Sequence, residues 1–303
     1  MAEVAVLGAT GFVGSAVVEA LTRRGAGVRH VRAPRLTTSA RTAEAVLRAV
    51  HHGAAASVVD ALSDRLRGVD AVVNAAGLAT ASSVATDALY GANALLPAFV
   101  TAAVSGLEGA PRFVHVSSAA VQGRAVRLDE SPVTRPFSAY SHSKALGEAV
   151  VGPAGTVFRP TSVHGAGRPT TALLRRLVSS PIASVAGEGA SPTPQVQVVN
   201  VGDAIAFVTL TGDPPPRFVL QPAEDLTVAG LVRLLGGREP RHVPEGLARA
   251  VVRVGFGLGG RSPRLAGPAR RLEMLWFGQG QERGWLAGRW RPPAGPEGWR
   301  ELW

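Results

Sequence analysis

The sequence contains no cysteine, so the chain can form neither a disulfide nor a thiolate metal site, and we expect no metal. The lack of thiols fits a reducing compartment, and we expect a cytoplasmic protein. The N-terminus enters an apolar segment by Val4 without a basic region or a small-residue cleavage site, which argues against a signal peptide. No apolar run approaches the roughly 18 residues that a membrane span needs, so we expect no membrane partner.

Tyrosine and lysine are also rare. Tyr90 and Tyr140 are the only tyrosines in 303 residues, and Lys144 is the only lysine among 32 lysine and arginine residues. The arginines that give the net charge of +10 are dispersed and are not interleaved with aromatic residues, which argues against a nucleic-acid partner. An anionic small molecule or a solvated surface explains this charge equally well.

The stretch Ser138–Glu148 contains Tyr140 and Lys144 four residues apart. On a helix this spacing places both side chains on one face. An ammonium group beside a phenol favours the phenolate, so we predict a pKa of Tyr140 below its usual value of about 10. Such a phenol would donate or accept a proton near neutral pH. The alternative is that a surface tyrosine and lysine are four residues apart by chance.

The chain opens with a buried parallel strand at residues 3–8, followed by G-A-T-G-F-V-G and a helix that stops at Gly25. Gly8, Gly11 and Gly14 recur every three residues in this turn. Strand, glycine turn and helix together are typical of a site where the backbone approaches a pyrophosphate at a helix N-terminus.

The end of the second predicted strand, Val28–Val31, bears on the cofactor. NAD sites usually place an acidic residue about 20 positions beyond the glycine turn. Here Arg32 and Arg35 occupy that region, with no Asp or Glu nearby. Arginine offers charge-assisted hydrogen bonds to a 2′-phosphate, so we predict NADP(H) rather than NAD(H). The alternative is that both arginines lie on a solvated loop.

Further strands are predicted from short apolar runs at Ser57–Asp60, Asp70–Gly77, Arg112–Ser118, Thr156–Phe158, Val196–Val201 and Phe218–Leu220. Helices are predicted at Thr86–Val104 with a kink at Pro97, at Asp203–Leu210, Val228–Leu235 and Leu247–Leu258. We expect the last of these helices to pack in the protein rather than lie on a membrane. The five tryptophans between Trp276 and Trp303 are expected to anchor the C-terminal region, although they could also line a pocket.

These motifs occur in a recognisable order. G-A-T-G-F-V-G, D-A-V-V-N-A-A-G, V-S-S-A-A-V-Q-G, Y-S-H-S-K and R-P-T-S-V-H-G follow one another as in extended short-chain dehydrogenase/reductases. The chain resembles this superfamily, the NAD-dependent epimerase/dehydratase family, and most of all actinobacterial nucleotide-sugar 4-ketoreductases of deoxysugar pathways. The resemblance implies an α/β fold, a Rossmann-type doubly wound parallel sheet with a smaller C-terminal α/β substrate-binding domain. We expect the NADP-binding domain to span 1–164 with a strand and helix from 195–211. The substrate-binding domain would take 165–194 and 212–303.

The resemblance also implies roles for single residues. Ser118, or alternatively Ser117, would orient a substrate carbonyl, Tyr140 would protonate its oxygen, and Lys144 would hold the nicotinamide ribose. The cofactor-binding residues implied in addition are Gly8, Thr10, Gly11, Phe12, Val13, Gly14, Arg32, Arg35, Asp60, Ala61, Ala75, Ala76, Gly77, Asn93, Val116, Pro160 and Val163. Of these, Asp60 and Ala61 would contact adenine.

Departures from the family pattern shape the expected activity. Ala119 and Ala120 stand where dehydratases carry Asp and Glu, which argues against elimination. The arginine that often holds the substrate pyrophosphate is missing at Pro194–Gln195. We expect NADPH-dependent reduction of a 4-keto group on a nucleotide-activated deoxysugar, in a natural-product or cell-surface sugar pathway.

Three alternatives remain open: a ketoreductase for an uncharged polyketide, terpenoid or steroid-like carbonyl, an NAD-retaining epimerase, and a non-catalytic NADP-binding regulator. The resemblance further implies a homodimer through the helices at 86–104 and 138–151.

Overall fold

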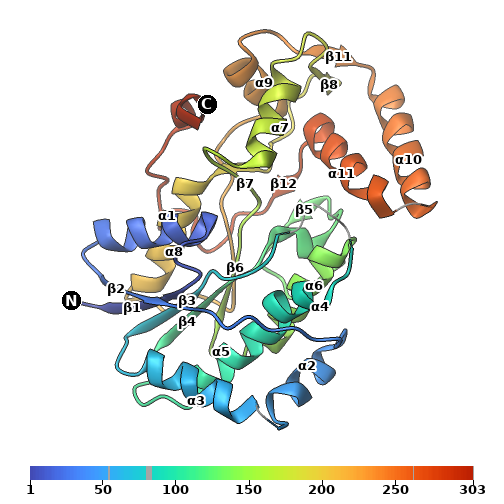
Figure 1. Ribbon diagram of the computed structural model, residues 1–303. Helices are drawn as coiled ribbons and strands as arrows, with labels where there is room; N and C mark the ends of the chain where they lie inside the picture. Colours follow the sequence, from blue (N-terminus) through green and yellow to red (C-terminus); the bar gives the residue numbers. More distant parts are fainter. Residues whose placement is uncertain (54, 80–83, 262, 303) are drawn as a thin grey trace.

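A six-stranded parallel sheet forms the centre of the protein (Figure 1). The computed structural model describes residues 1–53, 55–79, 84–261 and 263–302. The strands lie in the order β10-β6-β4-β3-β1-β2, and every neighbouring pair is parallel. Their bounds are β1 (Glu3–Leu7), β2 (Gly27–Val31), β3 (Ala71–Asn74), β4 (Arg112–Val116), β6 (Thr156–Arg159) and β10 (Phe218–Leu220). Strands buried on both faces explain the continuous apolar runs in the sequence.

Helices cover both faces of this sheet (Figure 1). One face carries α1 (Phe12–Arg23) and α8 (Val198–Leu210), and the other carries α2 (Ala43–Val50), α3 (Ala55–Leu66), α5 (Leu96–Ser105) and α6 (Ala139–Val150). Successive side chains of β1 point to opposite faces of the sheet. Val4 and Val6 therefore belong to the hydrophobic core under α1 and α8, whereas Ala5 and Leu7 belong to the core on the other face. The fold is therefore the predicted doubly wound Rossmann type.

The strand predicted at Ser57–Asp60 is wrong, because these residues lie inside α3. Ala55, Leu62 and Leu66 are the buried residues of that helix, and they belong to the same core as α5. A run as short as S-V-V-D does not distinguish a strand from a helix by its pattern.

The segment from Gln195 also differs from the prediction. A three-residue strand, β9 (Gln195–Gln197), pairs with β7 (Ser162–His164) in a separate sheet, and α8 begins at once at Val198. The predicted strand is therefore wrong after Gln197, and only the helix covers the main sheet. Conversely, β10 belongs to the main sheet, although the expected domain boundaries place its residues in the C-terminal domain.

The helix predicted at Thr86–Val104 is divided into three parts. A short α4 (Asp87–Tyr90) leads through a π-helical turn (Gly91–Leu95) into α5. Pro97 lies in the first turn of α5, where its missing N–H needs no partner. The whole segment Asp87–Ser105 has the length and mean hydropathy (1.4) of a membrane span, contrary to the expectation from the sequence. However, 72% of the 18-residue apolar stretch within this segment is buried inside the protein, as in a core helix.

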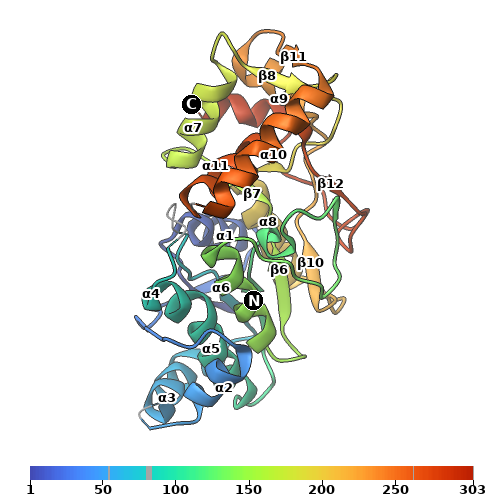
Figure 2. The same ribbon diagram turned by 90° about the vertical axis from the view of Figure 1, so that its right-hand side faces the viewer.

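The C-terminal region forms the upper part of Figure 1 and of the rotated view in Figure 2. Its helices are α7 (Pro169–Val178), α9 (Val228–Gly236), α10 (Glu245–Arg261), α11 (Pro263–Phe277) and a 3₁₀ helix at Pro296–Leu302. Two parallel strand pairs accompany them, namely β8 (Ser184–Ala186) with β11 (Arg241–Val243) and β5 (Arg127–Leu128) with β12 (Gly280–Gln281).

Tryptophans anchor the C-terminal tail as predicted. The indole N–H of Trp290 donates to Asp203 at 2.8 Å, and that of the fully buried Trp299 donates to Glu224 at 2.8 Å. Trp276 donates to the hydroxyl of Ser184 in β8. Trp303 lies outside the described residues.

A buried ion pair fastens α6 to the sheet. The Arg159 guanidinium at the end of β6 donates to both carboxylate oxygens of Glu148, at 3.0 and 2.7 Å, and the two side chains are 0% and 3% exposed. We predict that Glu148→Gln lowers the free energy of unfolding by about 3–5 kcal/mol, because it leaves a buried charge without its counter-ion. Urea unfolding measures this loss. Glu239→Gln, which breaks an exposed pair with Arg233, is the control and should change little; equal effects of both variants would contradict the prediction.

Candidate active site

The N-terminus of α6 is fixed by reciprocal hydrogen bonds. Ser138 Oγ accepts from the Ser141 N–H at 3.1 Å, and Ser141 Oγ accepts from the Ser138 N–H at 3.0 Å. This capping box sets the start of the helix, so that Tyr140 falls in its first turn. A Cβ at Gly147 would lie 2.2 Å from the Asn93 carbonyl oxygen, so only glycine lets α6 pack this closely on the π-helical turn.

Tyr140 and Ser118 meet beyond the carboxyl end of β4. The Ser118 hydroxyl hydrogen-bonds the phenol of Tyr140. Burial raises the pKa of Tyr140 above its usual value, and the Ser118 hydrogen bond and the charge of Arg168 offset this only in part. The alternative serine, Ser117, is buried, and its hydroxyl has no hydrogen-bond partner in the described part of the chain.

Lys144 points into the protein beside the end of β4. Its ammonium donates to the Val116 carbonyl oxygen at 3.0 Å, and burial lowers its pKa to about 8 although Glu148 acts in the opposite direction. Lys144 does not contribute to the pKa shift of Tyr140. The predicted lowering of the Tyr140 pKa is therefore wrong, because desolvation of the phenol outweighs the favourable charges near it.

Arg168 is a site residue that sequence reasoning missed. It caps the N-terminus of α7, donates to the Val163 carbonyl oxygen at 2.9 Å and lies over the Phe12 ring at 4.5 Å. It also interacts electrostatically with Tyr140. This half-buried cation thus connects the glycine turn with the phenol. No local motif identifies it, because it approaches both from the C-terminal region.

The glycine turn fits a dinucleotide. Gly8 has φ +79°, and a Cβ at Gly14 would lie 1.9 Å from the Gly8 carbonyl oxygen, so the turn tolerates no side chains there. Helix α1 follows from Gly11 with no side-chain cap and no acidic residue in its first turn. Its N-terminal amides can therefore face a pyrophosphate. Thr10, Phe12 and Val13 line this turn as exposed or half-buried residues.

The loop after β3 closes against this turn. A Cβ at Gly8 would lie 2.6 Å from the Ala76 amide nitrogen, and one at Gly77 would lie 3.0 Å from Lys144 Nζ. Asn93 holds the loop, since its side-chain amide donates to the Leu78 carbonyl oxygen and its side-chain oxygen accepts from the Leu78 N–H, both at 2.9 Å. Ala75 and Ala76 are half-buried and leave room for close approach by a ligand.

Three residues predicted to border the nicotinamide have backbone carbonyl oxygens that already accept hydrogen bonds from other protein groups. The carbonyl oxygens of Val116, Pro160 and Val163 accept from Lys144, Ala119 and Arg168, respectively. Two buried hydroxyls close to them in the sequence, Ser117 and Thr161, have no partner among the described residues. Both hydroxyl oxygens are enclosed by the protein.

Arg32 and Arg35 lie exposed on the segment that follows β2, and Arg65 of α3 donates to the Arg32 carbonyl oxygen at 3.3 Å. This end of the protein thus carries three guanidinium groups. The sequence did not point to Arg65, because a strand was predicted where α3 forms. Asp60 and Ala61 are exposed on α3. No strand ends at these residues, and their contact with adenine stays a prediction.

His164 is buried at the end of β7. Its Nε2–H donates to Gln195 Oε1 at 2.6 Å, Thr171 Oγ1 lies 3.2 Å from Nδ1, and the ring packs against Trp299. Gln195 marks the place where the family usually has an arginine. Here its side chain holds a neutral histidine and does not provide a charge for a ligand.

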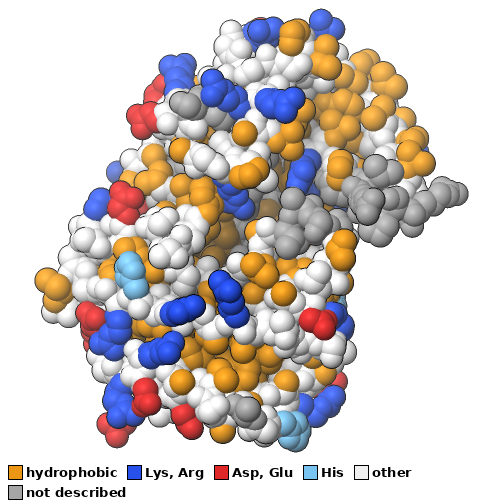
Figure 3. All heavy atoms as spheres, viewed as in Figure 1, with side chains coloured by type: hydrophobic (Ala, Val, Ile, Leu, Met, Phe, Trp, Pro, Cys, Tyr) orange, Lys and Arg blue, Asp and Glu red, His pale blue; other side chains and the backbone are white. Residues whose placement is uncertain are grey.

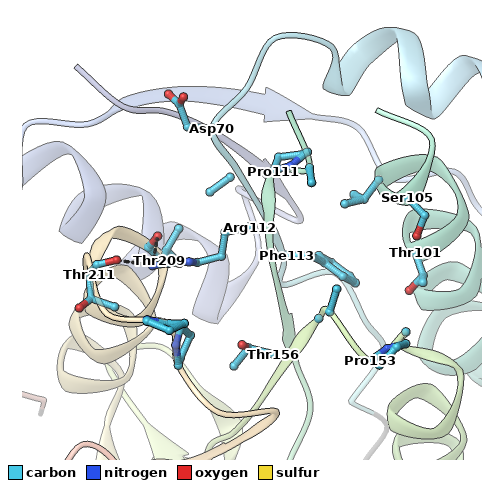
Figure 4. A pocket seen from close by; sticks show the side chains of 18 of the residues that line it. Asp70, Thr101, Ser105, Pro111, Arg112, Phe113, Pro153, Thr156, Thr209 and Thr211 are labelled. Atoms are coloured by element: carbon cyan, nitrogen blue, oxygen red, sulfur yellow. Dashed lines mark hydrogen bonds between the residues drawn. The ribbon is translucent and has the colours of Figure 1, made fainter. Parts of the chain in front are cut away.

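Cavities complete the geometry. Figure 3 shows a hollow between the sheet domain and the C-terminal helices, with basic side chains around it. A cavity of about 720 Å³ lies at the opposite, amino-terminal edge of the strands (Figure 4). Its Arg112 is occupied by the carbonyl oxygens of Val208, Thr209 and Thr211, so we see no catalytic set in it. A second cavity of about 660 Å³ lies between β5, α10 and α11.

Comparison with known proteins identifies the class. Residues 4–207 match the model of the NAD dependent epimerase/dehydratase family. The chain belongs to this family. It is an NAD(P)-dependent oxidoreductase of the extended short-chain dehydrogenase/reductase type, and its cofactor is a nicotinamide dinucleotide.

Individual relatives agree with this assignment. The chain is 30% identical over 253 residues to dTDP-6-deoxy-L-talose 4-dehydrogenase (NAD(P)(+)) of Kitasatospora kifunensis, covering 77% of this chain and 78% of that protein. Its fold resembles human epimerase family protein SDR39U1 with NADPH (TM-score 0.65, 18% identity, 99% and 98% of the two chains). It also resembles UDP-glucuronic acid 4-epimerase of Bacillus cereus with NAD (TM-score 0.62, 14% identity, 99% and 96%).

The buried histidine generates a pH prediction. Burial lowers the pKa of His164 from 6.5 to about 4, so between these values the unfolded chain binds a proton that the folded one does not. The free energy of unfolding should therefore fall by up to about 3 kcal/mol as the pH decreases from 6.5 to about 4. Urea unfolding across this range should show this part of the pH dependence missing in His164→Gln and retained in a variant of exposed His51. An unchanged slope in His164→Gln would contradict it.

Proposed function

We propose that the protein reduces the 4-keto group of a nucleotide-activated deoxysugar with NADPH. The observation that carries this proposal is the meeting of Tyr140 and Ser118 beside a glycine turn that fits a dinucleotide. The substrate class is supported by the relative that acts at position 4 of a dTDP-deoxysugar. Cytoplasmic localisation and dimerisation through α4, α5 and α6 stay predictions.

The chemistry follows from the protonation of the phenol. When bound, the nicotinamide supplies the hydride that reaches the carbonyl carbon. Because the pKa of Tyr140 is raised, its phenol is protonated at neutral pH and can donate that proton to the carbonyl oxygen. Ser118 would hydrogen-bond the same oxygen and orient the ketone. The phenolate left behind is stabilised by the Ser118 hydrogen bond and by the charge of Arg168, until solvent returns the proton.

Elimination is disfavoured by the residues next to Ser118. Ala119 is buried and Ala120 is half-buried, and neither offers an acid or base to the neighbouring carbon. The choice of NADPH is supported by Arg32 and Arg35. They have no carboxylate partner among the described residues and could donate hydrogen bonds to a 2′-phosphate.

The proton-donor role predicts a loss of turnover in Tyr140→Phe. Removing the hydroxyl should reduce kcat by about 100-fold or more, because a positioned general acid contributes at least that factor. The assay follows NADPH absorbance with a dTDP-4-keto-6-deoxysugar. Tyr90→Phe removes the only other tyrosine hydroxyl, which is hydrogen-bonded to His142, and should keep near-normal kcat. Full activity of Tyr140→Phe would refute the assignment.

The cofactor preference predicts a selective effect of Arg32→Asp. The variant replaces a candidate phosphate-binding cation by a repelling charge, so KM for NADPH should rise about ten-fold or more while KM for NADH changes little. Steady-state kinetics with both cofactors measures the ratio. Arg48→Asp, at an exposed position of α2, is the matched control. Equal rises for both cofactors would remove the 2′-phosphate role.

A further inference from the structure

The cavity of about 660 Å³ beside α10 is lined by an unusual number of cations. We call it the arginine pocket, after the five arginines that line it: Arg124, Arg127, Arg249, Arg253 and Arg270. One comes from the loop that leads into β5, one from β5 itself, two from α10 and one from α11. Figure 1 shows α11 above β5 and β12, with α10 beside it. The volume is that of a small-molecule site.

The positive charges of the arginine pocket are only partly neutralised. Glu273 is the only carboxylate among the described residues that line the pocket, and it accepts from both Arg124 and Arg270. Burial acts to raise the pKa of Glu273, but these two arginines outweigh it and hold the pKa below its usual range.

Arg249 pairs with Glu245 from its own helix. The side chains of Arg127 and Arg253 are exposed and have no hydrogen bond or ion pair within the described part of the chain. The pocket therefore keeps an excess of positive charge that an anion would neutralise.

Aromatic rings make the other component of the lining. The guanidinium of Arg124 lies 4.0 Å from the centre of the Phe256 ring, and that of Arg249 lies 5.0 Å from the centre of the Phe277 ring. These cation–π contacts hold two cations against the cavity wall. Both phenylalanines are half-buried, so their rings are also partly open to a ligand. Arginines beside aromatic rings suit a ligand that carries both phosphate and a flat base.

The arginine pocket is also linked to the catalytic serine through the chain. Ser118 begins a 3₁₀ turn (Ala119–Gln122), and the next residues bring Arg124 and Arg127 to the cavity. The side chain of Arg270 fixes this segment, since it donates to the Gly123 carbonyl oxygen at 3.1 Å. One short segment thus borders both the phenol and the pocket.

We propose that the arginine pocket binds a nucleoside diphosphate, with its phosphates at Arg127 and Arg253 and its base against Phe256 or Phe277. The assignment of this nucleotide to the substrate rests on the proposed function. The pocket would supply the cations that Pro194 and Gln195 do not provide. A free nucleotide carries the same chemistry, and the measurements below distinguish the two sources.

Direct binding tests this independently of turnover. We would titrate dTDP, pyrophosphate and thymidine into the full chain saturated with NADP⁺ and follow the heat released. Arg127→Gln/Arg253→Gln should weaken dTDP and pyrophosphate about ten-fold or more, because two charge-assisted hydrogen-bonding partners are lost. Phe277→Leu should weaken dTDP more than pyrophosphate. Arg238→Gln/Arg241→Gln removes the same charge from exposed positions elsewhere and should leave dTDP binding unchanged.

Two results would overturn the proposal: unchanged dTDP affinity in Arg127→Gln/Arg253→Gln, or an equal loss in Arg238→Gln/Arg241→Gln. Competitive inhibition of ketone reduction by dTDP would identify the pocket as the substrate's nucleotide site. Non-competitive inhibition would identify a free nucleotide as the ligand. If only aglycone ketones are reduced while dTDP still binds through Arg127 and Arg253, the proposed substrate fails and the pocket stands.

Discussion

The buried ion pair between Arg159 and Glu148 is the constraint on which the site depends. It joins the end of a central strand to α6, the helix that carries Tyr140 and Lys144. Arg159 also donates to the Ser131 carbonyl oxygen at 2.6 Å, so the loop before α6 is held by the same guanidinium. Two charges without solvent are costly unless their geometry is fixed, and the fixed geometry orients the helix. The position of the phenol relative to β4 therefore follows from an interaction two helical turns away.

The only lysine of the chain stands where the space suits an ammonium. Its Nζ lies 3.0 Å from the Val116 carbonyl oxygen and 3.0 Å from the place a Cβ would take at Gly77. A guanidinium is wider, planar and keeps its charge, whereas an ammonium is compact and can lose its proton when buried. With a pKa of about 8, Lys144 is close to that change near neutral pH. This explains why one position in an arginine-rich chain is a lysine.

The sequence predicts the parts of the structure that are determined by a local residue pattern. The apolar runs of β1, β3 and β4 and the glycine spacing identified the sheet and the dinucleotide turn, because backbone geometry fixes both locally. The prediction at Ser57–Asp60 failed because a four-residue run has no decisive period. The predicted lowering of the Tyr140 pKa was wrong because burial, which raises this pKa, is a property of the whole fold. Arg168 could not be found, since only tertiary packing brings α7 to the glycine turn.

The protonation state of Tyr140 is set by the balance between its burial and the groups beside it. A phenol that accepts a proton at neutral pH must have a lowered pKa, whereas one that donates must keep its proton until the ketone arrives. In this protein burial raises the pKa of Tyr140, whereas Ser118 and Arg168 act in the opposite direction and favour the ionised form. The cation that favours the ionised phenol is Arg168, the N-cap residue of α7. Desolvation of one hydroxyl thus holds the proton on the phenol, and the cation that favours its ionised form is supplied from a separate part of the fold.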